Sequence, residues 1–270
     1  MTQKSLAKII FPEAENENII AATKSAKLRQ ICQPWLEKMP LEKAFNLVKK
    51  GEADALIAGI ENTTRALVLA SWQILGLKQD EKTFGSFFVA KLRDGRELML
   101  TDGGVTKNPS AEQLADTTWQ SIMAAQKIWP ERKIRAAMLS FSTFGSGGED
   151  ASITKIQDAL KLLHAKKSER EKASEQEILI EGEMQLDVAI NATVGQKKAP
   201  QSQVAGKANL LVVPDLNAGN ILYKAMEQFA GAVVAGPILT GFKAPVSDLS
   251  RGSSLEDVIF TTECLVKLLA

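Results

Sequence analysis

Histidine and cysteine are scarce in this chain. Among its 270 residues there is one histidine, His164, and there are two cysteines, Cys32 and Cys264. Two cysteines are too few for a disulfide framework, and none of these residues has the spacing of a zinc site. A histidine-based catalytic triad is excluded unless His164 supplies the base. We expect His164 to be structural or exposed and Cys264 to pack in the core.

Charge of one sign and long apolar segments are also missing. The 33 Lys and Arg residues nearly balance the 32 Asp and Glu residues, so the formal net charge is +1. Bulk binding of nucleic acid needs a basic surface, and we therefore expect no nucleic-acid partner. The longest apolar stretches, such as 231–241, are far shorter than a membrane span, so no membrane partner is expected. The first residues lack a long apolar region, which predicts no signal peptide and a cytoplasmic location.

Short apolar runs and amphipathic stretches alternate along the chain. The apolar runs predict strands at 9–11, 55–58, 84–92, 96–101, 135–141, 178–180, 210–213 and 232–235. The stretches between them predict helices at 16–31, 41–50, 63–75, 110–128, 150–165, 217–230 and from about 254 to the end. The segment 166–177 is predicted to be a solvated helix end or loop, and 195–207 a polar loop. This alternation indicates βαβ units, and therefore a largely parallel sheet with helices on its faces.

Two of the predicted loops carry groups that suit an anionic ligand. Ligands of open α/β sheets bind beyond the carboxyl ends of the strands. The loop 140–148 follows a strand there, and its hydroxyls and glycine amides at a helix N-terminus suit phosphate. The loop 213–220 has the same position after another strand. Asp215 or Asn217 in it could equally be a helix cap.

A third loop, 248–257, combines helix-start signals with chemistry. Ser253 and Glu256 are spaced as a capping box, which would explain those two residues alone. Arg251 offers five donors to an anion. Asp257 lies in the first turn of the last helix, where the helix dipole favours the carboxylate, and a carboxylate can serve as a general base.

Three segments together resemble a known family. They are FPEAENENIIAA (11–22), APQSQVAGKANLLVVPDLNAGNILYK (199–224) and GPILTGFKAPVSDLSRGSSLEDV (236–258), with support from AMLSFSTFGS and EGEMQLDVAI. The combination is similar to the phosphate acetyltransferase and phosphate butyryltransferase family. The resemblance extends from about residue 8 to the end of the chain.

The resemblance implies an isocitrate/isopropylmalate-dehydrogenase-like fold of two three-layer α/β domains with a cleft between them. Domain I would combine 1–78 with 240–270, and domain II would be 79–239, through which we expect a homodimer to form. The implied reaction is the reversible transfer of a short acyl group between CoA and inorganic phosphate. Acetyl is the first expectation, and butyryl or a branched acyl group is the alternative. CoA is then a substrate, and no permanently bound cofactor or metal is expected.

The resemblance also assigns roles to individual residues. Asp257 would take the proton of the CoA thiol, Ser250 would hydrogen-bond near the thiol or the reacting carbonyl, and Arg251 would clamp the phosphate. Transfer would be direct, since the sequence shows no activated Cys or His nucleophile. The other residues expected to bind CoA or substrate are Ser142, Thr143, Gly145, Ser146, Asn217, Asn220 and Arg65.

Several positions depart from the family pattern. Leu69 stands where the family has an arginine, and Arg65, one helical turn earlier, could replace it. Asn62 stands in place of the familiar histidine, and Gln228 in place of a further arginine. The chain is also shorter than the family norm, mainly around 30–45. These departures support a second hypothesis, a weak or silent homologue that binds CoA or a protein partner without turnover. A dehydrogenase of the same fold is disfavoured, because no G-x-G-x-x-G follows a strand.

Overall fold

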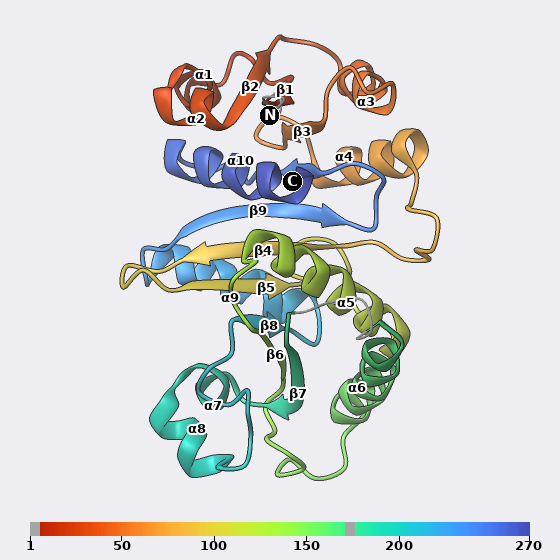
Figure 1. The fold of residues 1–270 in the computed structure, drawn as a ribbon, viewed down its shortest axis with the longest axis vertical. Coiled ribbons are helices and arrows are strands. Elements are labelled where there is room, and N and C mark those ends of the chain that lie inside the picture. The colour runs from red at the N-terminus through yellow and green to blue at the C-terminus, as the bar shows by residue number, and fades with distance from the viewer. Residues whose placement is uncertain (1–5, 171–175) are drawn as a thin grey trace. The chain divides into compact units, whose positions relative to one another are not determined.

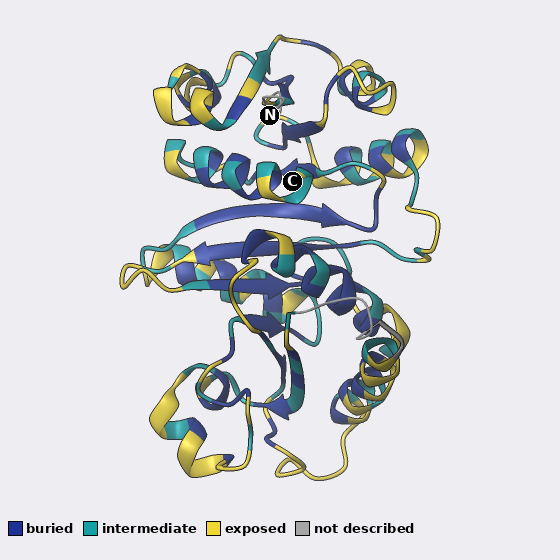
Figure 2. Cartoon of the chain, in the orientation of Figure 1, coloured by how far each residue is buried: buried dark blue, intermediate teal, exposed yellow. Residues whose placement is uncertain are grey.

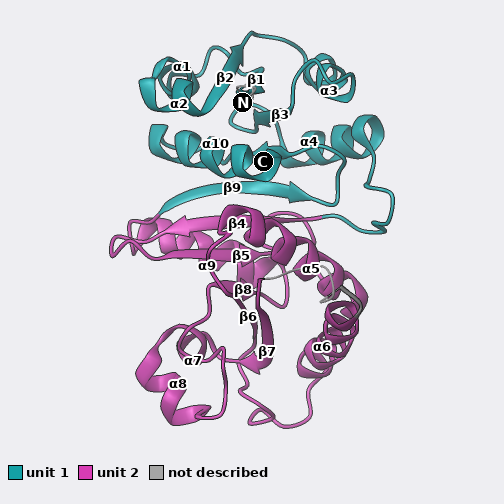
Figure 3. Ribbon diagram, viewed as in Figure 1, with its two compact units in different colours: residues 1–84, 233–270 teal, residues 85–232 magenta. Residues whose placement is uncertain are grey.

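The computed structural model describes residues 6–170 and 176–270 of the chain. Contacts between Cα atoms divide the chain into two compact units. Unit 1 is Met1–Phe84 with Val233–Ala270, and unit 2 is Gly85–Ala232 (Figure 3).

The sheet of unit 1 is mainly parallel. Its strands are β1 (Ala7–Phe11), β2 (Cys32–Leu36), β3 (Ala55–Ala58), β9 (Val233–Thr240) and β10 (Val246–Asp248), in the order β2–β1–β3–β10–β9. All neighbours are parallel except β10 and β9. The strands predicted at 9–11, 55–58 and 232–235 are confirmed. β2 and β10 were not predicted, because the first contains a proline and the second is only three residues long.

The helices of unit 1 form two groups. They are α1 (Glu17–Lys24), α2 (Ala26–Ile31), α3 (Leu41–Lys49), α4 (Thr64–Ala70), the π-helical turn η1 (Ser71–Leu75) and α10 (Leu255–Leu269). α10 packs against α1 and α2, whereas α3 packs against α4 and η1. Strand β2 lies on one side of β1 and β3 on the other, so right-handed crossovers put α1–α2 and α3 on opposite faces (Figure 1).

The prediction of a single helix over 16–31 is wrong, because the helix is interrupted at Ser25. The Ser25 backbone is extended, and its side chain accepts the N–H of Leu28 at 3.2 Å as the cap of α2. A hydroxyl in that position competes with continuous helix, since it offers the backbone another partner.

The sheet of unit 2 begins with a hairpin and continues in parallel. β4 (Gly85–Lys91) and β5 (Glu97–Thr101) form the predicted antiparallel pair. β6 (Ile134–Leu139), β7 (Ile178–Met184) and β8 (Leu210–Val212) complete the order β4–β5–β8–β6–β7, with parallel pairing from β5 onward. All five strands lie within or overlap the predicted ones, and most of their residues are buried (Figure 2).

The helices of unit 2 lie on both faces of its sheet. They are α5 (Ala111–Ile128), α6 (Ala151–Arg170), α7 (Leu186–Ile190), α8 (Ala192–Lys198) and α9 (Leu216–Gln228). Side chains alternate between the faces of a strand. On β4, a Cβ added to Gly85 would meet Thr117 of α5, whereas Phe88 stacks on Tyr223 of α9. α5 and α9 therefore lie on opposite faces, and α6 packs beside α5.

One predicted loop needs correction, and the described start of a segment predicted as a helix end or loop is a helix end. The loop predicted over 195–207 is helical at its start, because Asn191 accepts the N–H groups of Thr193 and Val194 and so caps α8. The segment predicted over 166–177 continues α6 to Arg170. Its residues 171–175 lie outside the described part of the chain.

In both units, the helices that follow neighbouring parallel strands lie on opposite faces of the sheet. In unit 2, β6 continues into α6, whereas its neighbour β8 continues into α9 on the other face. In unit 1, β3 leads to α4, whereas its neighbours β1 and β10 lead to α1 and α10. Such switch points leave a crevice at the carboxyl ends of the strands, where open α/β sheets bind ligands.

A close backbone approach in unit 2 predicts a strong effect of one methyl group. A Cβ at Gly219 of α9 would lie 2.6 Å from Cα of Gly103 and 2.8 Å from the carbonyl oxygen of Asp102. Gly219→Ala should therefore lower the free energy of unfolding by about 2 kcal/mol or more, because backbone cannot move aside as a side chain can. Urea unfolding measures this. Gly252→Ala, where a Cβ would meet nothing within 4 Å, is the control, and equal losses in both variants would contradict the packing.

Candidate functional site

At the carboxyl edge of the unit 1 sheet, the carboxylate of Glu13 binds a run of backbone N–H groups. Glu13 follows β1 and is 2% exposed. Its Oε1 accepts the N–H groups of Gly59, Glu61 and Asn62 at 2.9–3.0 Å, and the side-chain amide of Asn62 at 2.8 Å. Its Oε2 accepts the N–H of Ile60 at 2.9 Å. Convergent N–H groups form an anion site, and here the protein's own carboxylate fills it.

A second buried carboxyl group, that of Asp248, lies at the end of β10 and is 3% exposed. Its Oδ1 lies 2.5 Å from where a Cβ on Gly59 would be, so only glycine at that position leaves room for the carboxyl. Burial raises the pKa of Asp248 to about 6, a hydrogen bond from Thr64 opposes the rise, and the carboxylate of Glu13 adds to it. Asp248 thus connects the end of β10 to the first residue of α4.

The Ser250–Arg251 turn begins two residues after Asp248. The N–H of Leu249 donates to the carbonyl of Ala58 at 2.6 Å, which fixes the entry to the turn. The N–H of Ser253 then donates to the carbonyl of Ser250 at 2.9 Å and closes it. Ser250 is half-buried and Arg251 is exposed, so both predicted residues lie on an accessible loop at the carboxyl edge of the sheet.

The predicted capping box at Ser253 and Glu256 is wrong by one residue. α10 begins after Ser254, whose hydroxyl accepts the N–H of Asp257 at 3.2 Å. Oδ2 of Asp257 accepts both the N–H and the hydroxyl of Ser254 at 2.8 Å. Oδ1 of Asp257 accepts the N–H of Val234 at 2.9 Å. The residue predicted as base is therefore also the N3 residue of the cap, and its carboxylate orientation is fixed by three hydrogen bonds.

Arg65 and Leu69 lie on the exposed side of α4. They are one turn apart, and both are exposed, Leu69 to 49%. The hydrogen bond between Thr64 and Asp248 ties the start of this helix to the Ser250–Arg251 turn. Within unit 1 the structure thus connects Arg65, Ser250, Arg251 and Asp257 through short segments at one edge of the sheet.

In unit 2, the glycine-rich loop after β6 wraps around the carboxylate of Glu183. Its Oε1 accepts the hydroxyl of Ser142 at 2.8 Å and the N–H of Gly145 at 2.7 Å, and Oε2 accepts the amide of Gln157 at 3.3 Å. Burial alone would raise the pKa of Glu183, but the Gly145 N–H and the Ser142 hydroxyl hold it below its usual value. Ser142 is fully buried, and its oxygen also accepts the N–H of Gly147 at 2.9 Å. Two of the groups predicted to bind an external anion are thus engaged by an internal one.

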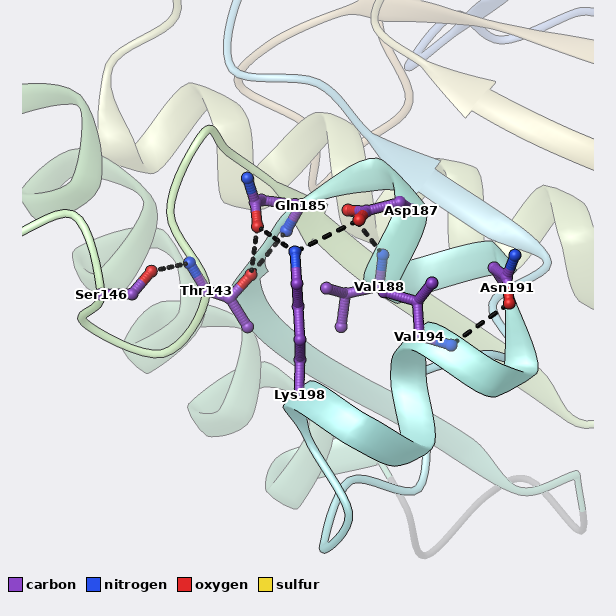
Figure 4. A network of polar contacts seen from close by, with 8 residues as sticks. All are labelled: Thr143, Ser146, Gln185, Asp187, Val188, Asn191, Val194 and Lys198. Atoms are coloured by element: carbon purple, nitrogen blue, oxygen red, sulfur yellow. Dashed lines mark hydrogen bonds and ion pairs between the residues drawn. The ribbon is translucent and has the colours of Figure 1, made fainter.

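The outer part of this loop connects to α7 and α8 (Figure 4). The N–H of Thr143 donates to the hydroxyl of Ser146 at 2.9 Å, and the Thr143 hydroxyl accepts the N–H of Gln185 at 3.1 Å. Lys198 of α8 donates to Gln185 at 2.9 Å and forms an ion pair with Asp187 at 3.2 Å. Ser146 is exposed and Thr143 nearly buried, so of these two Ser146 is the more accessible.

At the end of β8, the cap of α9 is Asp215, whose Oδ1 accepts the N–H of Ala218 at 3.0 Å. Asn217 is the exposed second residue of the helix, and Asn220 is half-buried one turn later. The sequence left open whether Asp215 or Asn217 caps this helix. In the structure Asp215 is the cap and Asn217 is not.

A lysine on α6 that sequence reasoning did not select lies between the loops after β5 and β8. Nζ of Lys155 donates to the carbonyl of Pro214 at 2.9 Å and to Oδ1 of Asn108 at 3.1 Å. Burial lowers the pKa of Lys155, and the Asp215 carboxylate opposes this shift. No pattern in the sequence singles out this lysine among the others of the helix, because its partners are 47 and 59 residues away.

The fold of the whole chain matches that of known acyl-transferring enzymes. The EutD phosphotransacetylase from Staphylococcus aureus superposes with a TM-score of 0.82 at 28% identity, covering 98% of this chain and 94% of the other. The expected isocitrate/isopropylmalate-dehydrogenase-like fold class is confirmed.

The sequence comparisons agree with this structural similarity. The phosphate acetyl/butaryl transferase family model matches residues 36–265. A phosphate acetyltransferase of Treponema pallidum is 38% identical over 85% of this chain and 67% of its own length. One of Nitrosomonas europaea is 35% identical over 94% of this chain, which spans about a third (35%) of that longer relative. The chain belongs to the phosphate acetyl/butaryl transferase family.

The described residues offer neither a metal-binding cluster nor a membrane-spanning helix. Residues 6–170 and 176–270 contain no group of three or more His, Cys, Asp or Glu side chains placed to hold a metal ion. Within the same ranges, no helix has the length and apolar character needed to cross a bilayer.

The raised pKa of Asp248 predicts a pH-dependent cost to stability. In the unfolded chain the carboxyl titrates near 3.8 and in the folded chain near 6, so the folded state binds the proton more tightly. Stability is therefore lost as the pH rises from about 4 to about 6, by up to about 3 kcal/mol for two pKa units. Asp248→Asn should be more stable than the unsubstituted protein at pH 7 and nearly equal to it at pH 4.

Urea unfolding of both proteins across that pH range measures the difference. Asp80→Asn, which replaces an exposed carboxylate, is the matched control and should show little change at any pH. A stability difference for Asp248→Asn that is the same at pH 4 and pH 7 would contradict the assignment.

Proposed function

We propose that this protein catalyses the reversible transfer of an acetyl group between CoA and inorganic phosphate. The observation that carries the proposal is the connection between β10 and α10, in which Ser250, Arg251 and Asp257 follow one another at the carboxyl edge of the unit 1 sheet. Family membership supplies the reaction, and these residues supply an anion-binding donor, a hydroxyl and a base.

In the direction of acyl-CoA synthesis, Asp257 accepts the thiol proton of CoA. The resulting thiolate attacks the carbonyl carbon of acetyl phosphate, a C–S bond forms, the C–O bond to phosphate breaks, and inorganic phosphate leaves. A carboxylate has about four lone-pair positions. Three hydrogen bonds from Ser254 and Val234 use most of them and leave one on Oδ1, so the base is held in one orientation with one free acceptor position.

Ser250 and Arg251 act beside this base. The Arg251 guanidinium binds the phosphate oxygens and stabilises the charge that the leaving phosphate takes up. The Ser250 hydroxyl hydrogen-bonds near the thiol or the reacting carbonyl. Arg65 is exposed on the first turn of α4. It contributes a second positive charge in place of the family's arginine, whose position is occupied here by Leu69.

Unit 2 is proposed to bind CoA. Thr143, Ser146, Asn217 and Asn220 provide hydroxyl and amide groups at the carboxyl ends of β6 and β8. Ser142 and Gly145 serve the same loop from inside, since both donate to Glu183. We assign them a positioning role in CoA binding rather than contact with CoA.

The two units are proposed to be the two functional domains of a homodimeric enzyme that works in the cytoplasm. Two buried cysteines with free thiols are compatible with a reducing compartment. The proposed dimer forms through unit 2.

The first test is the release of free CoA thiol from acetyl-CoA, propionyl-CoA and butyryl-CoA, with and without phosphate. We expect phosphate-dependent release that is fastest with acetyl-CoA. Fastest release from butyryl-CoA would replace the acetyl assignment. A folded protein that binds CoA and shows no release would instead be a silent homologue, and restoring arginine at Leu69 and Gln228 would be the next step.

The role of Asp257 is tested by Asp257→Asn. The amide cannot take a proton, so kcat should fall by about 10²–10⁴-fold, while CoA binding measured by calorimetry is retained. Glu256→Gln is the control, because it makes the same chemical change one residue earlier on the exposed side of α10. Equal activities of the two variants would show that Asp257 is a capping residue only.

A further inference from the structure

We propose that Lys155 is a phosphate-binding residue of unit 2, whose ammonium group contacts the phosphoryl oxygens of a substrate. The proposal rests on the function proposed above, in which both substrates carry phosphate. It assigns to α6 a contact that the sequence patterns do not indicate.

Lys155 lies where the loops after three strands of unit 2 meet. It lies in the second turn of α6, which follows β6. Its two hydrogen-bond acceptors belong to the loops after β5 and β8. β8 lies between β5 and β6 in the sheet, and it alone of the three continues to the α9 face. Lys155 therefore occupies the switch point, where a ligand of this sheet is expected.

The ammonium group of Lys155 is held by two hydrogen bonds. Both acceptors, the Pro214 carbonyl and the Asn108 side-chain oxygen, are neutral, so they orient the group without neutralising it. The carboxylate that opposes the lowered pKa of Lys155 is that of Asp215, which also accepts the N–H of Ala218 as the helix cap. An ammonium group has three N–H donors. Two are used here, which leaves one for an anion.

This arrangement has an electrostatic cost. Lys155 is half-buried, and its pKa is lowered because burial disfavours the charged form. A phosphate group bound at the third N–H would offset that cost. Lys161 of the same helix is instead exposed and forms an ion pair with Asp158.

Three other donors at this edge are engaged internally. Ser142 and the N–H of Gly145 bind Glu183, and the N–H of Thr143 binds Ser146. Of the groups that the sequence suggested for phosphate, these three therefore have protein partners already. Lys155 of α6 supplies a positively charged donor, which the glycine-rich loop does not contain.

The phosphoryl oxygens could belong to inorganic phosphate or to CoA, and the test separates these sources. Lys155→Met removes the charge at similar side-chain length, and Lys161→Met makes the same change at an exposed position of α6 as the control. The thermal midpoint of each variant is measured with and without saturating inorganic phosphate, CoA or dephospho-CoA. A ligand that binds the folded state raises the midpoint whether or not the protein turns it over.

For Lys155→Met we expect at least a tenfold loss of affinity for phosphate, obtained from the concentration dependence of the shift, because one charge-assisted hydrogen bond is lost. Lys161→Met should bind like the unsubstituted protein. A loss confined to CoA, with dephospho-CoA binding unchanged, would support the lysine contact and place it on the ribose phosphate of CoA. Where Lys155→Met is too unstable to measure, Lys155→Arg keeps the charge and should retain most of the affinity.

Unchanged affinity of Lys155→Met for phosphate and for CoA would overturn the inference and leave Lys155 as a link between two loops. A lowered midpoint without ligand, with normal ligand-induced shifts, would do the same. The proposed function fails differently, through a protein that binds phosphate or CoA and shows no thiol release. That outcome would not alter the test of Lys155.

Discussion

The structure at both sheet edges depends on one kind of interaction, a buried carboxylate that accepts two or more hydrogen bonds from a neighbouring loop. Glu13 does this for the residues after β3, and Glu183 for the glycine-rich loop after β6. A buried carboxylate is costly unless its lone pairs are satisfied. Each of these carboxylates therefore fixes a loop that would otherwise be free to adopt other conformations.

Because of this constraint, some polar groups of the site bind an internal carboxylate, whereas others remain free to contact a substrate. The groups nearest the sheet, including Ser142 and Gly145, are used to hold Glu183. Arg251 on the β10–α10 connection and Ser146 on the glycine-rich loop remain exposed. Asp257 belongs to both kinds, because its carboxylate closes the cap of α10 and still retains an acceptor position for a proton. Preorganised groups of this sort stabilise charge without rearranging during the reaction.

Asp248 shows that the same edge is also a source of instability. It is buried close to the Glu13 carboxylate, and together these facts raise its pKa to about 6. Its hydrogen bond with Thr64 nevertheless ties α4 to the turn that carries Ser250 and Arg251. Strain and cost of this kind are common where a loop is held in place for function.

The sequence by itself determined the order of most strands and helices, because apolar periodicity and caps such as Ser110 are local. It also determined the family and the candidate residues of the β10–α10 connection, which are contiguous. It did not predict β2 and β10, which are short or contain proline and are strands only because β1 and β3 pair with them. Only the tertiary structure decided which side chain satisfies which group. Glu13, Glu183 and Lys155 meet partners 26 to 59 residues away, and no local pattern records such contacts.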